Sequence, residues 1–216
     1  MHFPSFPYLV LFYNRAMSER RNLPIGIQTF EKIRVGNYVY VDKTQFVEKL
    51  ARYKCPYFLS RPRRFGKSLF LSTLKSYFEG RKDLFEGLSI SKTETEWKKY
   101  PVFYLDFNVG DFTDEENFRK SLGKKLSDYE DVYGSKGAQT LADRFSDLLK
   151  AAHEQTGLQA VILVDEYDKP LLNAIGDENL VDALPVPNHL AYADSCEIQI
   201  TMNCSQLVSI VLMVQN

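Results

Sequence analysis

Cysteine is scarce in this sequence. Its three cysteines, Cys55, Cys196 and Cys204, are scattered, with no C-x-x-C pair and no histidine at metal-ligand spacing. This distribution excludes a disulfide framework and gives no zinc site. The pattern is typical of a protein from a reducing cytoplasm, and we expect that location.

The start of the sequence lacks the features expected of a secretory leader or a membrane span. The first sixteen residues, MHFPSFPYLVLFYNRA, are apolar, but they have no cationic start and contain Pro4 and Pro7. The stretch is too short to cross a bilayer and does not match a signal peptide. We expect translation to begin at Met17 and residues 1–22 to be a loose N-terminal extension.

Positive charge is missing from the last part of the sequence. All 27 lysines and arginines lie at or before Lys169, whereas residues 170–216 hold five acidic residues. The formal net charge of -1 predicts no general attraction to nucleic acid or to a membrane. We expect the main domain to span residues 23–174, and residues 175–216 to be a divergent, poorly packed tail.

Short apolar runs alternate with helical patterns along the main domain. The predicted strands are 38–41, 55–60, 101–107 and 160–170. The predicted helices are 42–53, 67–79 before a stop at Gly80, and 114–154 with a turn at YGSKG. This alternation predicts an α/β fold with a parallel sheet flanked by helices.

Each predicted helix has an expected inward face. Asp42 is the expected N-cap of the first helix, with Gln45 three residues later. The expected inward residues are Phe46, Leu50 and Tyr53 on the first helix, Phe70, Leu74 and Tyr77 or Phe78 on the second, and Phe118, Leu122, Leu126, Phe145, Leu148 and Leu149 on the last.

The stretch FLSRPRRFGKSLFL has the end of the phosphate-binding pattern G-x-x-x-x-G-K-[ST] but lacks its first glycine, which Arg61 replaces. A strand, this loop and a helix would place backbone N–H groups and the positive end of a helix against an anion. Lys67 would reach the β- and γ-phosphates, and the Ser68 hydroxyl would bind Mg²⁺. The residues predicted to hold the nucleotide are Arg61, Pro62, Arg63, Arg64, Phe65, Gly66, Lys67, Ser68 and Leu69.

Two carboxylates directly follow the apolar run VILV. Phosphoryl transfer needs a carboxylate that holds Mg²⁺ and a group that orients the attacking water. We predict that Asp165 binds Mg²⁺ together with Ser68, and that Glu166 and Lys67 are catalytic. ATP is expected rather than GTP, because no N-K-x-D motif occurs and residues 165–168 lack a D-x-x-G element.

Other residues have two interpretations each. Asp106 ends a predicted strand and either tunes the Mg²⁺ site or caps the next segment. Asp42, Lys43 and Thr44 either line the nucleotide or, for Asp42, cap a helix. The run RPRR alone is compatible with a nucleic-acid patch, but its place in the loop favours the phosphates of ATP.

Four segments together resemble a known family. They are LPIGIQTFEKIRVGNYVYVDKTQFVEKL, YFLSRPRRFGKSLFLSTLKSYFEGRKDLFEGL, YPVFYLDF and VILVDEYDKPLL, and they are similar to the bacterial AAA-ATPase-like family, whose loop is typically RPRRFGKS. The resemblance covers Leu23 to Asn173 and implies a P-loop NTPase with an altered Walker A motif and a Walker B strand. Members usually continue into a PD-(D/E)XK nuclease-like domain, so the resemblance also implies a truncated chain with an incomplete core.

The leading hypothesis is a Mg²⁺-dependent ATP-binding module whose hydrolysis drives a conformational change in a partner or missing domain. The alternatives are a non-hydrolysing remnant or interaction module, and a DNA-associated module. Such a core needs a further parallel strand with a polar residue near the γ-phosphate, for which Asn203 in EIQITMN is a candidate. No Lys or Arg after Lys169 can serve as an arginine finger, so we expect weak ATP binding and slow turnover.

Overall fold

The computed structural model describes residues 21–53, 57–60, 64–107, 115–134, 137–166 and 208–215. Its helices and strands in chain order are α2 (Phe30–Val35), α3 (Thr44–Tyr53), β1 (Tyr57–Ser60), α4 (Lys67–Phe78), the 3₁₀ helices η1 (Lys82–Phe85) and η2 (Ser89–Lys92), β2 (Val102–Asp106), α5 (Glu115–Tyr133), α6 (Leu141–Thr156), β3 (Ala160–Asp165) and β4 (Val208–Gln215).

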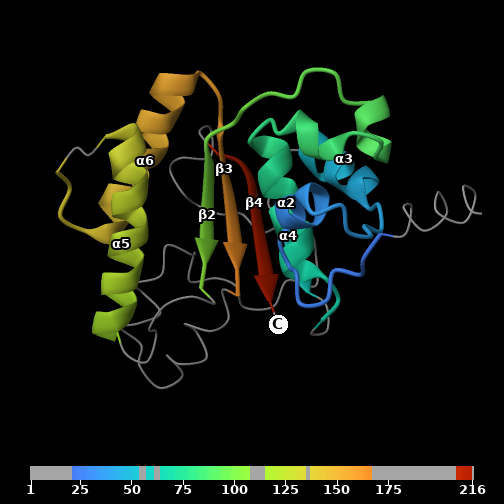
Figure 1. Cartoon of the computed structure of the whole chain (residues 1–216). Helices are drawn as coiled ribbons and strands as arrows, with labels where there is room; N and C mark the ends of the chain where they lie inside the picture. The colour runs from blue at the N-terminus through green and yellow to red at the C-terminus, as the bar shows by residue number, and fades with distance from the viewer. Residues whose placement is uncertain are drawn as a thin grey trace, which may run out of the picture.

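Four parallel strands form one sheet in the order β1-β4-β3-β2. Helices α5 and α6 cover one face of this sheet, and α2, α3 and α4 lie on the other (Figure 1). Helices on both faces of a parallel sheet define an α/β fold. The predicted α/β class with a parallel sheet flanked by helices is therefore confirmed, whereas the P-loop NTPase assignment and the incomplete core stay predictions.

Strand β3 is buried along its whole length because helices cover both of its faces. Ala160, Ile162 and Val164 belong to the hydrophobic core beneath α5 and α6. Val161 and Leu163 belong to the second core, which contains α4. Successive side chains of a strand point to opposite faces, so β3 contributes to both cores.

Helices α5 and α6 bury the six residues predicted to face inward. Each of these side chains is at most 4% exposed. The predicted break between the helices is also present, since α5 ends at Tyr133 and α6 begins at Leu141. Arg144 of α6 then bridges to Glu130 of α5, with 2.6 Å between Nη2 and Oε2. The two helices thus form one layer.

Residues 38–41 do not form the predicted strand. The segment has no strand partner within the described ranges, and the N–H group of Val39 donates to the carbonyl of Asn22 at 2.9 Å. Val41 is 70% exposed, while Tyr40 packs edge-on against Phe30 at a ring distance of 5.0 Å. An apolar run without a neighbouring strand forms no backbone ladder, which the sequence pattern alone does not show.

Helix α3 begins after the predicted cap Asp42 but differs from its prediction in its buried face. It begins at Thr44, and its inward side contains the fully buried Val47 together with the partly buried Leu50. Phe46, predicted to be inward, is 44% exposed. Helical periodicity identifies an apolar stripe but not which edge of that stripe meets the core.

In helix α4, too, the buried face differs from the predicted one. Leu71, Leu74 and Phe78 are buried, whereas Phe70 is only partly buried and lines a pocket. The helix ends before Gly80, whose left-handed backbone (φ +71°) suits the predicted stop.

Strand β4 was not predicted. Residues 208–215 were assigned to a poorly packed tail, whereas they pair with β1 on one side and with β3 on the other. Their sequence, VSIVLMVQ, is rich in β-branched residues, which favour strands. The sheet therefore extends beyond the predicted boundary at residue 174, and the boundaries themselves remain predictions.

Asp42 joins the start of α3 to η2. Its Oδ1 accepts hydrogen bonds from the Thr44 N–H at 2.9 Å and the Thr44 hydroxyl at 2.7 Å. Its Oδ2 accepts from the N–H and hydroxyl of Ser89, both at 2.7 Å. Burial raises the pKa of Asp42, but these hydrogen bonds outweigh burial and lower the pKa to about 2.

We expect Asp42→Ala to lower the free energy of unfolding by about 1–2 kcal/mol at pH 7. Because the folded pKa lies below the ordinary value of 3.8, the ionised group stabilises the fold above about pH 4 and loses this effect as the pH falls toward 2. Urea unfolding at pH 7 and pH 2.5 should show the difference between the proteins shrinking in acid. Asp131→Ala, at an exposed position on α5, is the control. A pH-independent difference would contradict this role.

Candidate functional site

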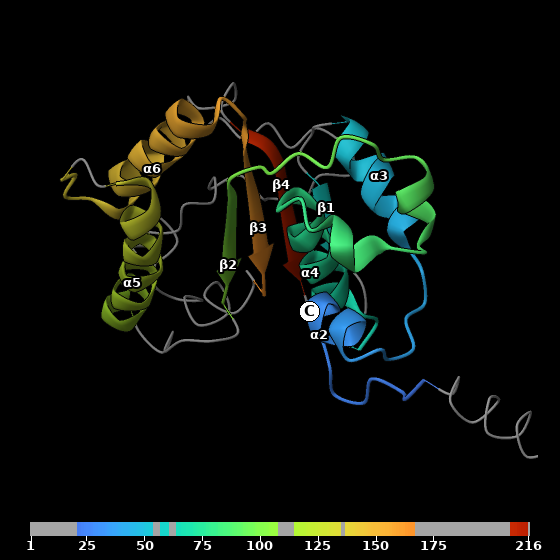
Figure 2. The ribbon, with the colours of Figure 1, turned by 45° about the horizontal axis from the view of Figure 1, so that its top comes forward.

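The carboxyl ends of the four parallel strands lie at one edge of the sheet, which Figure 2 shows next to the start of α4. The strand register aligns Ser60 of β1 with Gln215 of β4, and Asp165 of β3 with Asp106 of β2. The loop after β1 leads into α4, and Glu166 directly follows β3. Two motifs far apart in the sequence therefore meet at this edge.

Gly66 forms the N-cap of α4. Its backbone is left-handed (φ +73°), a conformation that glycine adopts without strain. Its carbonyl accepts the first helical hydrogen bond, from the Phe70 N–H at 2.9 Å. Within the described part of the chain no side chain caps α4. The N–H groups of its first turn therefore have the arrangement that binds anions at helix N-termini.

The first residues of α4 point in different directions. Lys67 is 5% exposed and lines a pocket together with Gly66. Ser68 is half-buried, and its side chain lies close enough to the Asp165 carboxylate to lower the pKa of that group. Leu69 is half-buried and packs against the hydrophobic core. The start of α4 and the end of β3 thus lie near each other at Ser68.

Of the other loop residues predicted to hold the nucleotide, the structure describes some and not others. Arg64 is exposed with a left-handed backbone (φ +67°), and Phe65 is 61% exposed. Arg61, Pro62 and Arg63 lie outside the described residues. Their predicted contacts with a nucleotide therefore stay predictions.

Asp165 is a buried carboxylate at this edge. It is 3% exposed, and the Tyr104 hydroxyl donates to its Oδ2 at 3.3 Å. Its Oδ1 is buried and has no hydrogen-bond partner among the residues that the structure describes. Burial raises the pKa of Asp165 and the charge of Asp106 adds to this, against the hydrogen bonds from Ser68 and Tyr104.

A buried carboxylate oxygen without a donor is costly, and a cation that prefers oxygen ligands would satisfy it. Ser68 and Asp165 together offer a hydroxyl and a carboxylate, which are suitable donors for Mg²⁺. The described residues contain no group of three or more His, Cys, Asp or Glu side chains that could hold a metal by themselves. A cation here would therefore need further ligands from water or from a bound phosphate.

Glu166 follows Asp165 with an unusual backbone. Its φ is +57°, in the left-handed region that non-glycine residues rarely adopt, and its side chain is only 7% exposed. Such conformations cost on the order of 1–3 kcal/mol and cluster at functional sites. The strain at Glu166 and at Arg64, on the two chain segments that meet here, marks this edge as a candidate site.

Residues with two sequence interpretations can now be placed. Asp42 hydrogen-bonds to Thr44 and Ser89, which supports its capping role. Lys43 lines the same pocket as Lys67, so this part of the D-K-T stretch does lie near the loop. Asp106 is close enough to Asp165 to raise its pKa.

Sequence reasoning missed Tyr104. This residue lies on β2, opposite Leu163 of β3, and its hydroxyl binds Asp165. Both backbone groups of Tyr104 in turn hydrogen-bond to the Tyr129 hydroxyl of α5, at 2.6 Å from N–H and 3.2 Å from C=O. In the sequence, Tyr104 stands two residues before Asp106, the end of the predicted strand. From sequence alone, a tyrosine at that position cannot be distinguished from an ordinary core tyrosine.

Asn203, the candidate polar residue near the γ-phosphate, lies outside the described residues. The β4 residue at the carboxyl edge of the sheet is Gln215.

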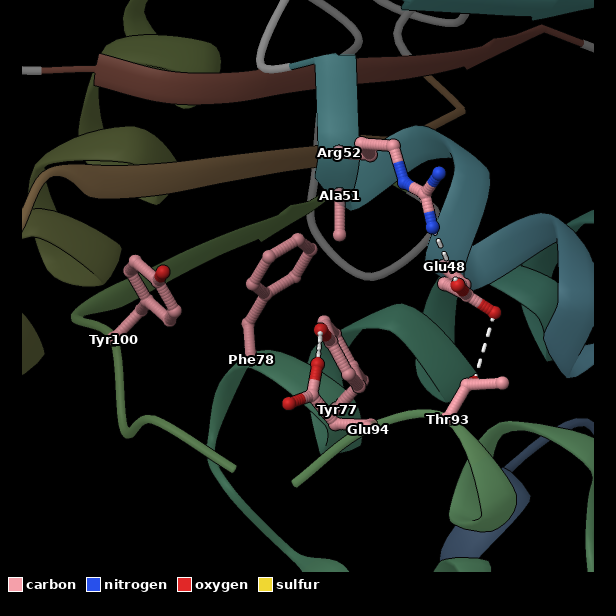
Figure 3. Close-up of a pocket in the computed structure, with 8 residues that line it drawn as sticks. All are labelled: Glu48, Ala51, Arg52, Tyr77, Phe78, Thr93, Glu94 and Tyr100. Carbon is pink, nitrogen blue, oxygen red and sulfur yellow. Dashed lines mark hydrogen bonds and ion pairs between the residues drawn. The ribbon is translucent and has the colours of Figure 1, made fainter. Parts of the chain in front are cut away.

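A second pocket, of about 270 Å³, lies beside the other end of α4 (Figure 3). Its two carboxylates already have partners. Glu48 binds Arg52 at 2.8 Å and accepts from the Thr93 hydroxyl at 2.9 Å, and Glu94 accepts from the Tyr77 hydroxyl at 2.5 Å. These pairs hold α3, α4 and the segment after η2 together, so we assign this pocket a structural role.

None of the helices that the structure describes is both long and apolar enough to span a membrane.

Comparison with known proteins identifies the family. A family model described as Predicted AAA-ATPase matches residues 24–186. The chain belongs to this family. The sequence resemblance to AAA-ATPase-like proteins is therefore confirmed at the level of the family.

A relative of this predicted AAA-ATPase is known from Azotobacter chroococcum mcd 1, where it is described as an uncharacterized protein in the vnfD 5' region. It is 44% identical over 156 residues, which are 71% of this chain and 30% of the relative. The chain thus spans less than a third of the relative's length. No solved structure matches the chain.

Proposed function

We propose that this predicted AAA-ATPase binds Mg-ATP at the carboxyl edge of its sheet, and that hydrolysis changes the conformation of a partner or attached domain. One observation carries most of the argument. Ser68, in the first turn of α4, lies close enough to Asp165 at the end of β3 to lower the pKa of that carboxyl, whose Oδ1 is buried without a described partner. A phosphate-binding helix start and a metal-binding carboxylate must meet in this way for phosphoryl transfer.

Each residue at this edge would have its own role. Lys67 would donate to the β- and γ-phosphates, and the Gly66 backbone would allow their close approach. Ser68 and Asp165 would hold Mg²⁺, which neutralises phosphate charge when bound. Glu166 would orient the attacking water and accept its proton. The buried position of Lys67 and Glu166 would strengthen these electrostatic interactions.

The alternative is a nucleotide-binding module that does not hydrolyse ATP. Its support is that residues 170–216 contain no Lys or Arg. An arginine that stabilises the transition state can be worth roughly a thousandfold or more in rate. Turnover would then depend on a cation from another part of the site or from a partner.

Metal dependence tests the proposal. We expect saturable binding of a fluorescent ATP analogue in Mg²⁺, and an affinity at least about tenfold lower in EDTA. Asp165→Asn should remove most of this Mg²⁺ effect, whereas Asp131→Asn, an exposed residue of α5, should retain it. An analogue that does not bind the wild-type protein, or that binds Asp165→Asn with full Mg²⁺ dependence, would overturn the assignment.

A further inference from the structure

Tyr104 and Asp165 lie on the same face of the sheet. Strands β2 and β3 are parallel neighbours, in which Tyr104 is opposite Leu163 and Asp106 is opposite Asp165. Leu163 belongs to the core that contains α4, and Tyr104 packs against that core. Alternate residues of a strand share a face, so the Asp165 side chain is on the α4 side of the sheet as well.

The Tyr104 hydroxyl reaches diagonally along the sheet to the Asp165 carboxylate. It donates to Oδ2 at 3.3 Å, and Asp165 is almost fully buried. A phenol is protonated at neutral pH, so the tyrosine is the donor and the carboxylate is the acceptor. A carboxylate that is held through one oxygen rotates less freely and keeps its other oxygen for a second partner.

Tyr104 is itself held in place from α5. The Tyr129 hydroxyl accepts from the Tyr104 N–H group at 2.6 Å and donates to the Tyr104 carbonyl at 3.2 Å. The Tyr129 ring packs against Phe103, the preceding residue of β2, with 4.8 Å between the ring centres. A chain of hydrogen bonds therefore runs from α5 through β2 to the end of β3.

This chain ends on a carboxylate whose orientation matters for the proposed site. Carboxylates that bind metals are usually hydrogen-bonded to other groups, which set their orientation and strengthen metal binding. A buried tyrosine needs only some partner for its hydroxyl. Here that partner is the carboxylate that also lies near Ser68 of the phosphate-binding helix.

We propose that Tyr104 is a positioning residue, which holds Asp165 in the orientation that binds Mg²⁺ and is itself fixed by Tyr129. The inference rests on the proposed function, because it concerns the same metal-binding carboxylate. It gives β2 a part in the site, in addition to the phosphate-binding loop and the end of β3.

Tyr104→Phe tests this role, since it removes only the hydroxyl and keeps the ring in the core. Mg²⁺ is titrated at a fixed concentration of the fluorescent ATP analogue, and binding is also measured in EDTA. We expect the variant to need about 10- to 100-fold more Mg²⁺ for half-saturation, the usual effect of losing a group that orients a metal ligand. Its affinity for the analogue in EDTA should equal that of the wild type.

Two further variants make the test specific. Tyr77→Phe removes a hydroxyl that donates to a different carboxylate, Glu94, beside the other end of α4, and should leave the Mg²⁺ requirement unchanged. Asp165→Asn should retain only a small Mg²⁺ effect. Adding Tyr104→Phe to it should reduce this effect no further, because the effects of two residues that act through one contact are not additive.

The possible results have distinct meanings. A wild-type Mg²⁺ requirement in Tyr104→Phe would overturn the positioning role and leave the proposed function standing. A loss of affinity in EDTA, an equal change in Tyr77→Phe, or a further loss in the double variant would also overturn it, since the hydroxyl would then act other than through Asp165. A wild-type protein whose binding of the analogue is independent of Mg²⁺ would overturn the proposed function, and the inference with it.

Discussion

Lys67→Ala should lose at least about 100-fold in affinity for Mg-ATP, because charge-assisted hydrogen bonds to phosphate contribute about 1.5–3 kcal/mol each. Lys67 is the first residue of α4, is 5% exposed, and lines the pocket beside Gly66. Titration with the fluorescent ATP analogue measures the loss.

Two controls make the result specific. Lys75→Ala removes a partly exposed lysine from the same helix, whose Nζ lies 2.6 Å from Glu79 Oε1, and should keep wild-type affinity. Arg61→Gly restores the common loop glycine and should also bind ATP. Thermal unfolding shows whether each variant is folded. A folded Lys67→Ala protein with unchanged affinity would disprove the phosphate-binding assignment of this loop.

Glu166→Gln should keep Mg-ATP binding and lower hydrolysis by about 10²- to 10⁴-fold, which is the usual effect of a general base. Glutamine has nearly the size of glutamate, so the left-handed backbone at φ +57° is disturbed no more than in the wild type. The carboxylate that would accept a proton from water is lost, while Asp165 and Ser68 remain. Single-turnover release of phosphate from ATP measures this effect without interference from product release.

Asp165→Asn gives the opposite pattern to Glu166→Gln and serves as its comparison. It should weaken the Mg²⁺ dependence of binding, because it removes a charge from the proposed metal ligand. Equal hydrolysis by Glu166→Gln and wild type would exclude Glu166 as the base. A wild-type protein that binds Mg-ATP without measurable turnover would favour the non-hydrolysing alternative.

Much of the fold was predictable because its signals are local. The apolar run of β3, the GKS start of α4 and the periodicity of α5 and α6 each appear within a few neighbouring residues. The meeting of Ser68 and Asp165 was also predictable, since parallel strands bring their carboxyl ends to one edge.

The missed features depend on partners that are distant in sequence. Whether Val39 and Val41 form a strand depends on a neighbouring strand, and whether Phe46 or Val47 faces inward depends on how α3 packs. Tyr104 acquires its role only because β2 lies beside β3. Strand β4 was not predicted, because its pairing partners, β1 and β3, lie far from it in the sequence.

The position of β4 also determines when the site can assemble. Among the described strands β1 pairs only with β4, so β1 and the loop after it have no sheet partner until residues 208–215 are in place. Pairing over such a sequence separation requires closure of a long loop, which slows folding. During synthesis, β2 and β3 can pair early, with Asp165 already next to Asp106. Lys67 and Ser68 follow β1 and its loop, so we expect full nucleotide binding to require the insertion of β4.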